Sequence, residues 1–320
     1  MDARTLRYFT AVADDGSFSR ASERLGIAQP ALSLQVRKLE AELGVELLWR
    51  TGRGVVPTAA GAKLLTHARE ILRRLDVARE DLRGEAAQPI GRVAIGLAQS
   101  LAVALTVPIV KEVVRAWPRV SLLINQGSTG YIPGWLRSGH LDLGFMFQAD
   151  TGQGLHYQPL VDEELFFVGP AQSLPIEAGH GATTGAFPFA DLKHYPLILP
   201  ARMHSLRELI DGYARRSGVN LHVIAEVDAV PQLKDLAMAG IGHTILSYSS
   251  VRDELASGRL SGARIVEPLV ERSVFLCRLA SVPPSNAVRA VEDLVRRTVT
   301  SLVSEGHWPA RISQRPSFEK

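Results

Sequence analysis

The stretch from Ser17 to Leu43 constrains the fold of this 320-residue chain most strongly, because it predicts two short helices joined by a tight turn. Ser17 or Ser19 is suited to cap the first helix, since a serine hydroxyl accepts a hydrogen bond from a backbone N–H at a helix start. Gly26 ends that helix, because glycine adopts a positive φ without a steric penalty. Pro30 fits the first turn of the second helix, where its missing N–H costs no hydrogen bond.

The second helix of this pair has one apolar side and one largely polar side. The apolar side carries Leu32, Val36, Leu39 and Leu43. These residues recur at helical spacing. The other side carries Gln29, Ser33, Leu34, Arg37 and Lys38. A second helix with a polar N-terminal half is typical of a DNA-reading helix-turn-helix. A helical hairpin whose polar residues merely face solvent fits the same spacing, so the spacing alone leaves both interpretations open.

Local charge favours the DNA-binding interpretation. Between Phe18 and Lys38 there are four basic residues and one acidic residue, which gives a local net charge of +3. From Arg50 to Lys63 there are three basic residues and no acidic residue, which again gives +3. Both segments suit a phosphate backbone. The formal net charge of the whole chain is only +3, so a DNA site must come from this local concentration of charge.

A short hairpin is predicted after the second helix. Gly44 ends that helix, and the apolar segments Val45–Trp49 and Val55–Val56 flank the glycine-containing run Arg50-Thr-Gly-Arg53-Gly54. This pattern is similar to the wing of a winged helix-turn-helix. An arginine at the wing tip, here Arg53, can enter a minor groove whose narrow form concentrates negative potential. The alternative is a solvated loop arginine.

A long helix with a heptad seam is predicted to follow, with Thr58 as its N-cap. The seam consists of Leu64, Ala68, Ile71, Leu75, Ala78 and Leu82. A long helix with one narrow apolar seam buries that seam best against a copy of itself. The sequence therefore predicts a dimer; the alternative is a helix that lies on the C-terminal domain of its own chain. The run GEAAQPIG, Gly84–Gly91, is small, contains proline and lacks periodicity, and it marks a domain boundary.

The C-terminal part alternates between strand and helix patterns, which predicts an α/β arrangement with parallel sheets. Strands are expected at Arg92–Leu97, Val120–Asn125, Leu141–Phe147, Glu164–Val168, Pro196–Leu199, His222–Val227, His243–Leu246 and Ser273–Ala280. Helices are expected at Ala102–Trp117, Ile132–Ser138, Ser205–Ser217, Val230–Ala239, Ser249–Ala256 and Ser285–Ser304. The last residues, 305–320, lack periodicity and contain two prolines, so we expect a flexible tail.

Small-molecule sites in open α/β sheets lie beyond the carboxyl ends of the strands. Three segments with hydroxyls or helix starts occupy such places: Ala98-Gln99-Ser100, Gly127–Gly130 and Pro200–His204. Hydroxyls and free N–H groups at helix starts suit an anion, and Arg202 adds a positive charge. Each serine or threonine taken singly is more often a plain helix cap than a ligand contact, so only convergence on one cleft supports a ligand site.

The run from Gly16 to Gly61 resembles the DNA-binding end of LysR-type transcriptional regulators. Within that family, IAQPALSLQV, RTGRGVVPTAAG and HAREILRRL are most similar to the nitrogen assimilation control subgroup. The resemblance implies a winged helix-turn-helix over residues 1–58, a linker and dimerisation helix with a hinge over 59–90, and an effector-binding domain over 91–304. That domain would have two α/β lobes like those of periplasmic solute-binding proteins, lobe I at 91–163 and 269–304, and lobe II at 164–268.

The resemblance also implies functional residues. The DNA-binding positions are Gln29, Pro30, Ala31, Ser33, Leu34, Arg37, Lys38, Arg50 and Arg53. Among these, Gln29 is suited to adenine, Leu34 to a thymine methyl, and the basic residues to the backbone and minor groove. The effector-cavity positions are Ser100, Ser128, Thr129, Phe147, Arg202, His204 and Val227. One departure leaves the pocket shape open, because Ser247-Tyr248 stands where the family usually has Leu-Pro.

The remaining features exclude several function classes. There is no GxSxG elbow, no HExxH and no paired Cys/His set, so we expect no catalysis, no metal and no cofactor. The single cysteine, Cys277, excludes an internal disulfide and lies in an apolar run; we expect a buried side chain, with a redox-sensing thiol as the alternative. The uncharged stretch Val93–Val110 is interrupted by polar residues and proline, so we expect buried core rather than a membrane span.

The function expected from the sequence is therefore DNA-binding transcriptional regulation, with promoter binding modulated by a small, anionic effector. The expected partners are double-stranded DNA with two-fold-related half-sites, further copies of this chain in a homodimer and homotetramer, and RNA polymerase if the protein is an activator. Control by protein abundance alone is the first alternative, and a solute-binding module or an enzyme is a remote one. Met1 to Arg4 show no signal-peptide pattern, so we expect a cytoplasmic protein.

Overall fold

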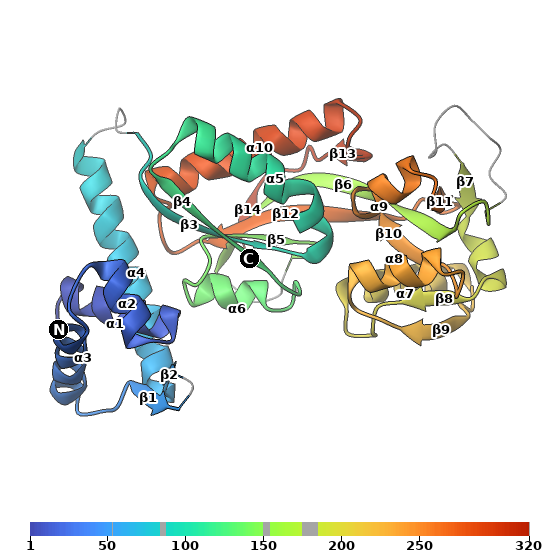
Figure 1. Cartoon of the computed structure of the whole chain (residues 1–320). Helices are drawn as coiled ribbons and strands as arrows, with labels where there is room; N and C mark the ends of the chain where they lie inside the picture. Colours follow the sequence, from blue (N-terminus) through green and yellow to red (C-terminus); the bar gives the residue numbers. More distant parts are fainter. Residues whose placement is uncertain (53, 84–87, 150–153, 175–184, 320) are drawn as a thin grey trace.

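The computed structural model describes residues 1–52, 54–83, 88–149, 154–174 and 185–319 (Figure 1). These residues form a small N-terminal domain, a long helix and a larger body of two α/β lobes. Figure 1 shows the small domain at one end of the molecule, with the long helix rising from it beside the nearer lobe. The chain thus separates a helical head from an α/β body.

The small domain is a helix-turn-helix followed by a hairpin. It consists of α1 (Ala3–Asp15), α2 (Phe18–Leu25), α3 (Gln29–Leu43), β1 (Leu48–Thr51) and β2 (Gly54–Pro57). Ser17, rather than Ser19, caps α2, because its hydroxyl accepts a hydrogen bond from the backbone N–H of Arg20. Gly26 and Gly44 end α2 and α3 in the left-handed conformation. The predicted helix-turn-helix is confirmed.

The apolar side of α3 forms the core of this domain together with α1. The fully buried residues are Phe9, Val12, Leu32, Val36 and Leu39. The prediction that Leu43 belongs to this buried side is wrong, since Leu43 is 38% exposed. It is the last residue of α3, beside the Gly44 cap, and it lies outside the apolar cluster.

The hairpin has the antiparallel pairing expected for a wing, with Leu48 opposite Pro57 and Thr51 opposite Gly54. Its first strand begins at Leu48 rather than at Val45. The Glu40 carboxylate accepts hydrogen bonds from the backbone N–H groups of Leu47 and Leu48, at 2.9 and 3.2 Å, and thereby holds the chain that enters the strand. Arg53, the predicted wing-tip residue, lies outside the described residues.

The long helix α4 (Ala59–Arg83) has two differently engaged sides. Its start is capped as predicted, because the Thr58 hydroxyl accepts a hydrogen bond from the N–H of Gly61 at 2.9 Å. Ala68 is buried against the small domain, whereas Leu75 is exposed and Leu82 is 90% exposed. Another side of α4 carries arginines that bind lobe I, among them Arg73. Both arrangements considered from the sequence therefore apply in part. One side of α4 lies on the α/β body, and the seam is covered by the small domain at Leu64 and Ala68 but exposed from Ile71 to Leu82.

Lobe I is a mixed sheet covered on both faces. Its strands are β3 (Gly91–Leu97), β4 (Val120–Gln126), β5 (Leu143–Met146), β12 (Glu271–Leu279) and the first half of β6 (Leu155–Pro170), in the order β4-β3-β5-β12-β6. Its helices are α5 (Gln99–Ala116), α6 (Ile132–Arg137) and α10 (Asn286–Ser304). α5 and α10 lie on one face and α6 on the other (Figure 1). The loops that follow β3 and β4 face lobe II.

Lobe II is built around the second half of β6. Its strands are β7 (Ala186–Pro188), β8 (Leu197–Leu199), β9 (Val223–Glu226), β10 (Thr244–Ser247) and β11 (Leu260–Val266). Its helices are η1 (Phe189–His194), α7 (Ser205–Ser217), α8 (Val230–Met238) and α9 (Tyr248–Ala256). One apolar cluster, which includes Phe167 and Ile245, joins these elements.

β6 runs without interruption through both lobes. The predicted strand Glu164–Val168 is only its lobe II half, and the expected lobe boundary at residues 163 and 164 falls inside it. The expectation of parallel sheets is wrong in part. β3 pairs with β4 and β5 in parallel, but β6 pairs antiparallel with β10, β11 and β12. β6 and β12 are antiparallel because the chain leaves lobe I along β6 and returns along β12, so these two connections run in opposite directions.

The expected flexible tail is ordered. β13 (Ala310–Ile312) and β14 (Phe318–Glu319) pair with the lobe I half of β6, and Trp308 is 1% exposed. The free edge of β6 needs backbone partners, and these two strands supply them. Strands of two or three residues are too short to show a period, which is why the sequence pattern missed them.

The uncharged stretch Val93–Val110 forms β3 and the first part of α5, and residues such as Ile95 and Leu105 are fully buried. The prediction of buried core is confirmed for β3 and the inner side of α5, whereas Val103 and Val107 on its outer side are exposed. Among the residues that the structure describes, no helix combines the length and the apolar character needed to cross a membrane.

Candidate functional site

The exposed side of α3 carries most of the predicted DNA-binding residues. The exposed residues are Gln29, Pro30, Ala31, Leu34, Arg37 and Lys38. α3 is held from beneath by its buried leucines and valine, so this exposed side has a fixed orientation relative to the hairpin. A helix presented in this way has the shape required to enter a major groove.

Ser33 and Arg50 are partners of each other. The Ser33 side chain is buried, so its expected exposure is wrong, and its hydroxyl accepts a hydrogen bond from Arg50 Nη2 at 3.2 Å. The Arg50 guanidinium also lies 4.9 Å from the centre of the Phe18 ring. Arg50 therefore ties the first hairpin strand to α3 and to the start of α2.

Some of the local positive charge near α2 is also engaged by the protein. Arg24 Nε donates to the Asp15 carboxylate at 3.0 Å, and Arg20 donates to the backbone carbonyl of Asp15. These contacts fix the end of α1 against α2. The charge count made from the sequence therefore overstates how much of the positive charge is available to a phosphate backbone.

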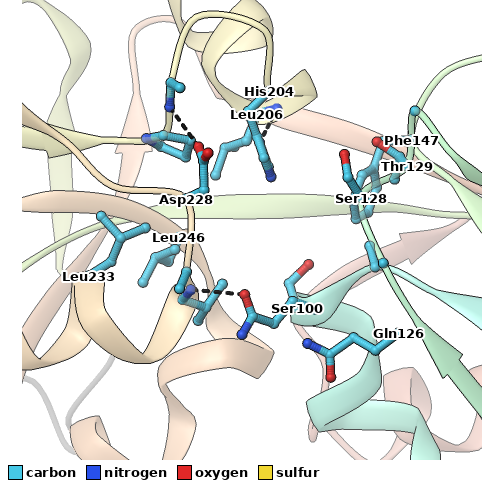
Figure 2. A pocket seen from close by; sticks show the side chains of 18 of the residues that line it. Ser100, Gln126, Ser128, Thr129, Phe147, His204, Leu206, Asp228, Leu233 and Leu246 are labelled. Carbon is cyan, nitrogen blue, oxygen red and sulfur yellow. Dashed lines mark hydrogen bonds between the residues drawn. The ribbon is translucent and has the colours of Figure 1, made fainter. Parts of the chain in front are cut away.

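A cavity of about 670 Å³ lies between the two lobes. Ser128, Thr129 and Phe147 face it from lobe I, and His204 and Asp228 face it from lobe II (Figure 2). Five of the predicted effector residues line this cavity: Ser100, Ser128, Thr129, Phe147 and His204. The carboxyl ends of β3, β4, β5 and β8 meet here, as expected for strands of open α/β sheets.

Two predicted effector residues do not line the cavity. The Arg202 side chain is 82% exposed, and its nearest anionic partner is the Glu226 carboxylate at 4.0 Å. Val227 packs against the core of lobe II. Arg202 follows a strand end as the pattern required, and Val227 was implied only by the family resemblance. The direction of a side chain next to a strand end depends on the fold around it.

Arg272, which the sequence reasoning missed, is the cation of the cavity. It is 5% exposed, its Nη2 donates to the Ser100 hydroxyl at 3.0 Å, and its Nε donates to the buried Glu163 carboxylate. Its guanidinium carbon lies 3.7 Å from the centre of the Phe147 ring. A signal was present in the sequence: Arg272 immediately precedes the predicted strand Ser273–Ala280 and lies two residues before its apolar run Val274–Cys277.

Two hydrogen bonds join the lobes across the cavity. The side-chain carbonyl of Gln99, at the start of α5, accepts a hydrogen bond from the N–H of Val230 at 3.0 Å (Figure 2). The hydroxyls of Thr129 and Ser205 share a second hydrogen bond at 3.2 Å. Because each bond links lobe I to lobe II, any change of the angle between the lobes must stretch or break them.

His204 reports the electrostatics of the cavity. Burial lowers its pKa below the ordinary value; the Asp228 carboxylate opposes this effect, and the Arg272 guanidinium adds to it. Its Nδ1 accepts a hydrogen bond from the N–H of Leu206 at 3.2 Å and caps α7. A neutral imidazole with an acceptor at Nδ1 carries its proton on Nε2, so His204 presents a hydrogen-bond donor rather than a full charge.

The departure at Ser247-Tyr248 is absorbed without closing the cavity. Ser247 lines the cavity and precedes α9, and its hydroxyl lies 2.8 Å from that of Ser250. The Tyr248 ring is half-buried, lies 5.5 Å from the ring of Phe166 and packs against the core of lobe II. Serine thus occupies the helix cap position here.

The described residues contain no cluster of three or more histidine, cysteine, aspartate or glutamate side chains placed to hold a metal ion. Cys277 is buried in lobe I, and burial raises the pKa of its thiol far above the ordinary value. A buried thiol that stays protonated is a poor nucleophile.

Comparison with known proteins matches almost the whole chain. Residues 3–62 match the family described as bacterial regulatory helix-turn-helix protein, lysR family, and residues 86–300 match the LysR substrate binding domain. The nitrogen assimilation regulatory protein nac of Klebsiella aerogenes is 32% identical over 94% of this chain and 96% of its own length. The DNA-binding transcriptional dual regulator OxyR of Escherichia coli is 27% identical over 98% and 99%.

Solved structures share the fold. A full-length OxyR variant from Pseudomonas aeruginosa superposes with a TM-score of 0.77 at 22% identity, covering 99% of both chains. Full-length CbnR in complex with its target DNA superposes with a TM-score of 0.62 at 24% identity, covering 93% of this chain and all of that one.

Proposed function

This chain belongs to the LysR family of bacterial DNA-binding transcriptional regulators, and on that premise we propose that it reads promoter DNA as a homodimer or homotetramer under the control of a small anionic effector. The observation that carries this proposal is that the same chain has both an exposed recognition helix, α3, and a cavity between its two lobes. That cavity holds a buried arginine. The protein acts in the cytoplasm, where its promoter target lies.

In the proposed complex, the exposed side of α3 enters the major groove. Gln29 hydrogen-bonds adenine, Leu34 contacts a thymine methyl, and Arg37 and Lys38 hold the phosphate backbone. Arg53 enters the adjacent minor groove. Ser33 and Arg50 act mainly by fixing the angle between the hairpin and α3, since each is the partner of the other.

Dimerisation through α4 is supported by the exposed half of its seam. Ile71, Leu75, Ala78 and Leu82 are exposed in the single chain. Burying such a stripe against its copy removes apolar surface from water and brings two recognition helices onto two-fold-related half-sites. An activator built in this way also contacts RNA polymerase when the head domains move.

The effector is proposed to place its anionic group near Arg272 and the start of α5. The Ser100 hydroxyl and Arg272 meet there, and the first turn of α5 supplies backbone N–H groups. Apolar side chains, among them Phe147, Leu233 and Leu246, line the rest of the cavity. Binding would change the angle between the lobes and, through α4, the position of the DNA-binding heads.

A second candidate function is the same DNA binding without a ligand, controlled by the amount of protein. Two observations favour it. Glu163 already neutralises Arg272, and the Gln99 and Thr129 hydrogen bonds hold the lobes together across the cavity. In this case the α/β body is a rigid spacer for assembly.

The DNA-binding part is tested by fluorescence anisotropy against DNA from upstream of the protein's own gene, with unrelated competitor DNA and a salt series. We expect competitor-resistant binding that weakens steeply with salt. Arg53→Ala should cost about 1–3 kcal/mol of binding free energy. The matched control is Arg119→Ala, which removes an equal charge from an exposed residue in the α/β body. Equal affinity for competitor DNA, with no difference between the two variants, would contradict the proposed DNA interface.

The effector part is tested by screening small organic anions against the full-length protein for thermal stabilisation. A true cavity ligand should lose its effect in Arg272→Met and keep it in Arg202→Met, because only the first arginine lines the cavity. Intact promoter binding without any responding anion would favour control by abundance.

A further inference from the structure

The C-terminal segment from Trp308 to Glu319, which we call the strap, lies beyond the matched family domains, which end at residue 300. It is nevertheless built into lobe I. The indole of Trp308 is buried, β13 and β14 extend along the edge of β6, and the Phe318 ring stacks on that of Tyr157 at 5.2 Å. The strap is therefore part of the packed structure of lobe I.

The strap touches a buried charge. Trp308 Nε1 donates a hydrogen bond to Glu163 Oε2 at 2.9 Å, and the Glu163 side chain has no exposed surface. The other carboxylate oxygen, Oε1, accepts from Arg272 Nε. A buried carboxylate is tolerated only when its oxygens are paired. The indole N–H and the guanidinium therefore share one carboxylate and fix its orientation.

Arg272 carries this orientation into the cavity between the lobes. Its Nη2 donates to the Ser100 hydroxyl at 3.0 Å, and its guanidinium carbon lies 3.7 Å from the centre of the Phe147 ring. Continuous contacts thus run from Trp308 through Glu163 and Arg272 to Ser100. Four separate segments of the chain contribute to this relay.

The strap is anchored at the same place by its backbone and by a surface charge. Ala310 pairs with Glu163 in the sheet, and the Pro309 carbonyl accepts from the N–H of Glu164 at 3.4 Å. Arg311 Nη2 donates to the Glu271 carboxylate at 3.2 Å. These contacts hold β6 and β12 where both strands pass from one lobe to the other.

We propose that the strap is a working part of the effector site, with Trp308 as a positioning residue that orients Arg272 through Glu163. This inference rests on the proposed effector function of the cavity. When the indole N–H is removed, one oxygen of Glu163 loses its partner inside the protein. The carboxylate then rotates or admits water, and the guanidinium above it loses its fixed direction toward a ligand.

The relay can be tested without a ligand by fluorine NMR of full-length protein labelled with fluorotryptophan. The chain has four tryptophans, and Trp308→Phe identifies the Trp308 resonance by its disappearance. We expect Ser100→Ala to move the Trp308 resonance by more than its line width and to leave that of Trp49, on the hairpin, in place. The matched control is Ser128→Ala, because Ser128 lines the same cavity but is not bonded to Arg272. If both serine variants leave the Trp308 resonance unchanged, the relay does not exist.

A second readout measures the consequence for binding. Anilinonaphthalene sulfonate, an anionic apolar dye, is titrated into the wild type, Trp308→Phe, Arg272→Met and the double variant. We expect Trp308→Phe to weaken dye binding by about threefold to tenfold, because Arg272 keeps its charge and loses only its fixed direction. Loss of a direct hydrogen bond between a charged group and the dye would cost about tenfold or more. It should have no further effect in the Arg272→Met background. The matched control is Arg119→Gln, which removes an equal charge from an exposed residue just before β4 and should bind the dye like the wild type.

The outcomes separate the two proposals. Equal weakening by Trp308→Phe in both backgrounds overturns the inference, because a merely structural role of the indole is additive. If the wild type binds no dye, the proposed anionic effector site is contradicted. The fluorine shifts then still test whether the contacts from Trp308 to Ser100 are coupled.

Discussion

Replacing Gly61 by alanine should destabilise the DNA-binding head, although the same change in an ordinary helix is stabilising. Gly61 lies in the first turn of α4, where a Cβ would stand 1.9 Å from the carbonyl oxygen of Leu47. Ordinary contacts begin at 3.4 Å. The start of α4 and the segment around Leu47 must therefore move apart by about 1.5 Å.

The magnitude follows from three contributions. Overpacking against rigid backbone costs about 1–3 kcal/mol. The Leu47 carbonyl also accepts a hydrogen bond from the N–H of Thr58 at 2.9 Å, and disturbing this bond costs about 1 kcal/mol. Alanine offsets about 1 kcal/mol through its higher helix propensity. The net expected destabilisation is about 1–3 kcal/mol.

Differential scanning calorimetry of the full-length protein measures this change as a lower temperature for the transition of the head domain. A loss of 1 kcal/mol corresponds to about 4–8 °C for a domain of this size. The same variant should bind promoter DNA more weakly, because the shift displaces the hairpin relative to α3.

Gly134→Ala is the matched control, since Gly134 is also helical but a Cβ there meets nothing within 4 Å. It should leave the protein equally stable or stabilise it by up to about 1 kcal/mol. Stabilisation by both substitutions would refute the reasoning, because it would mean that the close approach of α4 to Leu47 is absent or freely adjustable.

Two further predictions concern assembly and pH. Leu75→Lys should weaken the proposed α4 dimer by about 3–6 kcal/mol, because a two-fold axis places each substitution in the interface twice. Sedimentation should show the lower mass, and His67→Lys, at an exposed position of α4 outside the seam, should leave the assembly intact. Burial and the Arg69 guanidinium lower the pKa of His140 below 6.5. Below about pH 6.5 His140 is protonated in the unfolded chain but stays neutral in the folded chain over a further range of pH. The free energy of unfolding therefore decreases as the pH is lowered. His140→Gln should lose less stability than the wild type between about pH 8 and about pH 5 in thermal unfolding; an unchanged pH dependence would contradict this assignment.

The sequence predicted the head domain well because its signals are local. Ser17, Gly26 and Pro30 act within a few residues of their own positions, and the four-and-three spacing of Leu32, Val36 and Leu39 directly encodes a helix face. The same holds for most helices of the α/β body. Helical spacing predicts burial less well at the end of a helix: Leu43 continues the spacing, but it is 38% exposed.

The cavity was only partly predictable. Strand ends located Ser100, Ser128, Thr129 and His204, since the carboxyl ends of strands point to one place in this class of fold, and the family resemblance added Phe147. Arg202 follows the same rule and yet faces solvent. Arg272 was missed because it lies near the start of β12, the strand that leads back from lobe II to lobe I. Its place beside the cavity depends on the pairing of β12 with β6, which no local sequence pattern indicates.

The sequence by itself thus determined the helix-turn-helix, the long seam-bearing helix and the alternation of strands and helices, because each depends on residues within one or two turns. Only the tertiary structure decided that Ser33 serves Arg50 rather than solvent, that β6 spans both lobes, and that Trp308 reaches Glu163. The Trp308 and Glu163 partners are 145 residues apart in the chain, and no local period records a pairing over such a distance. It arises when the free edge of one strand and a buried charge both require partners.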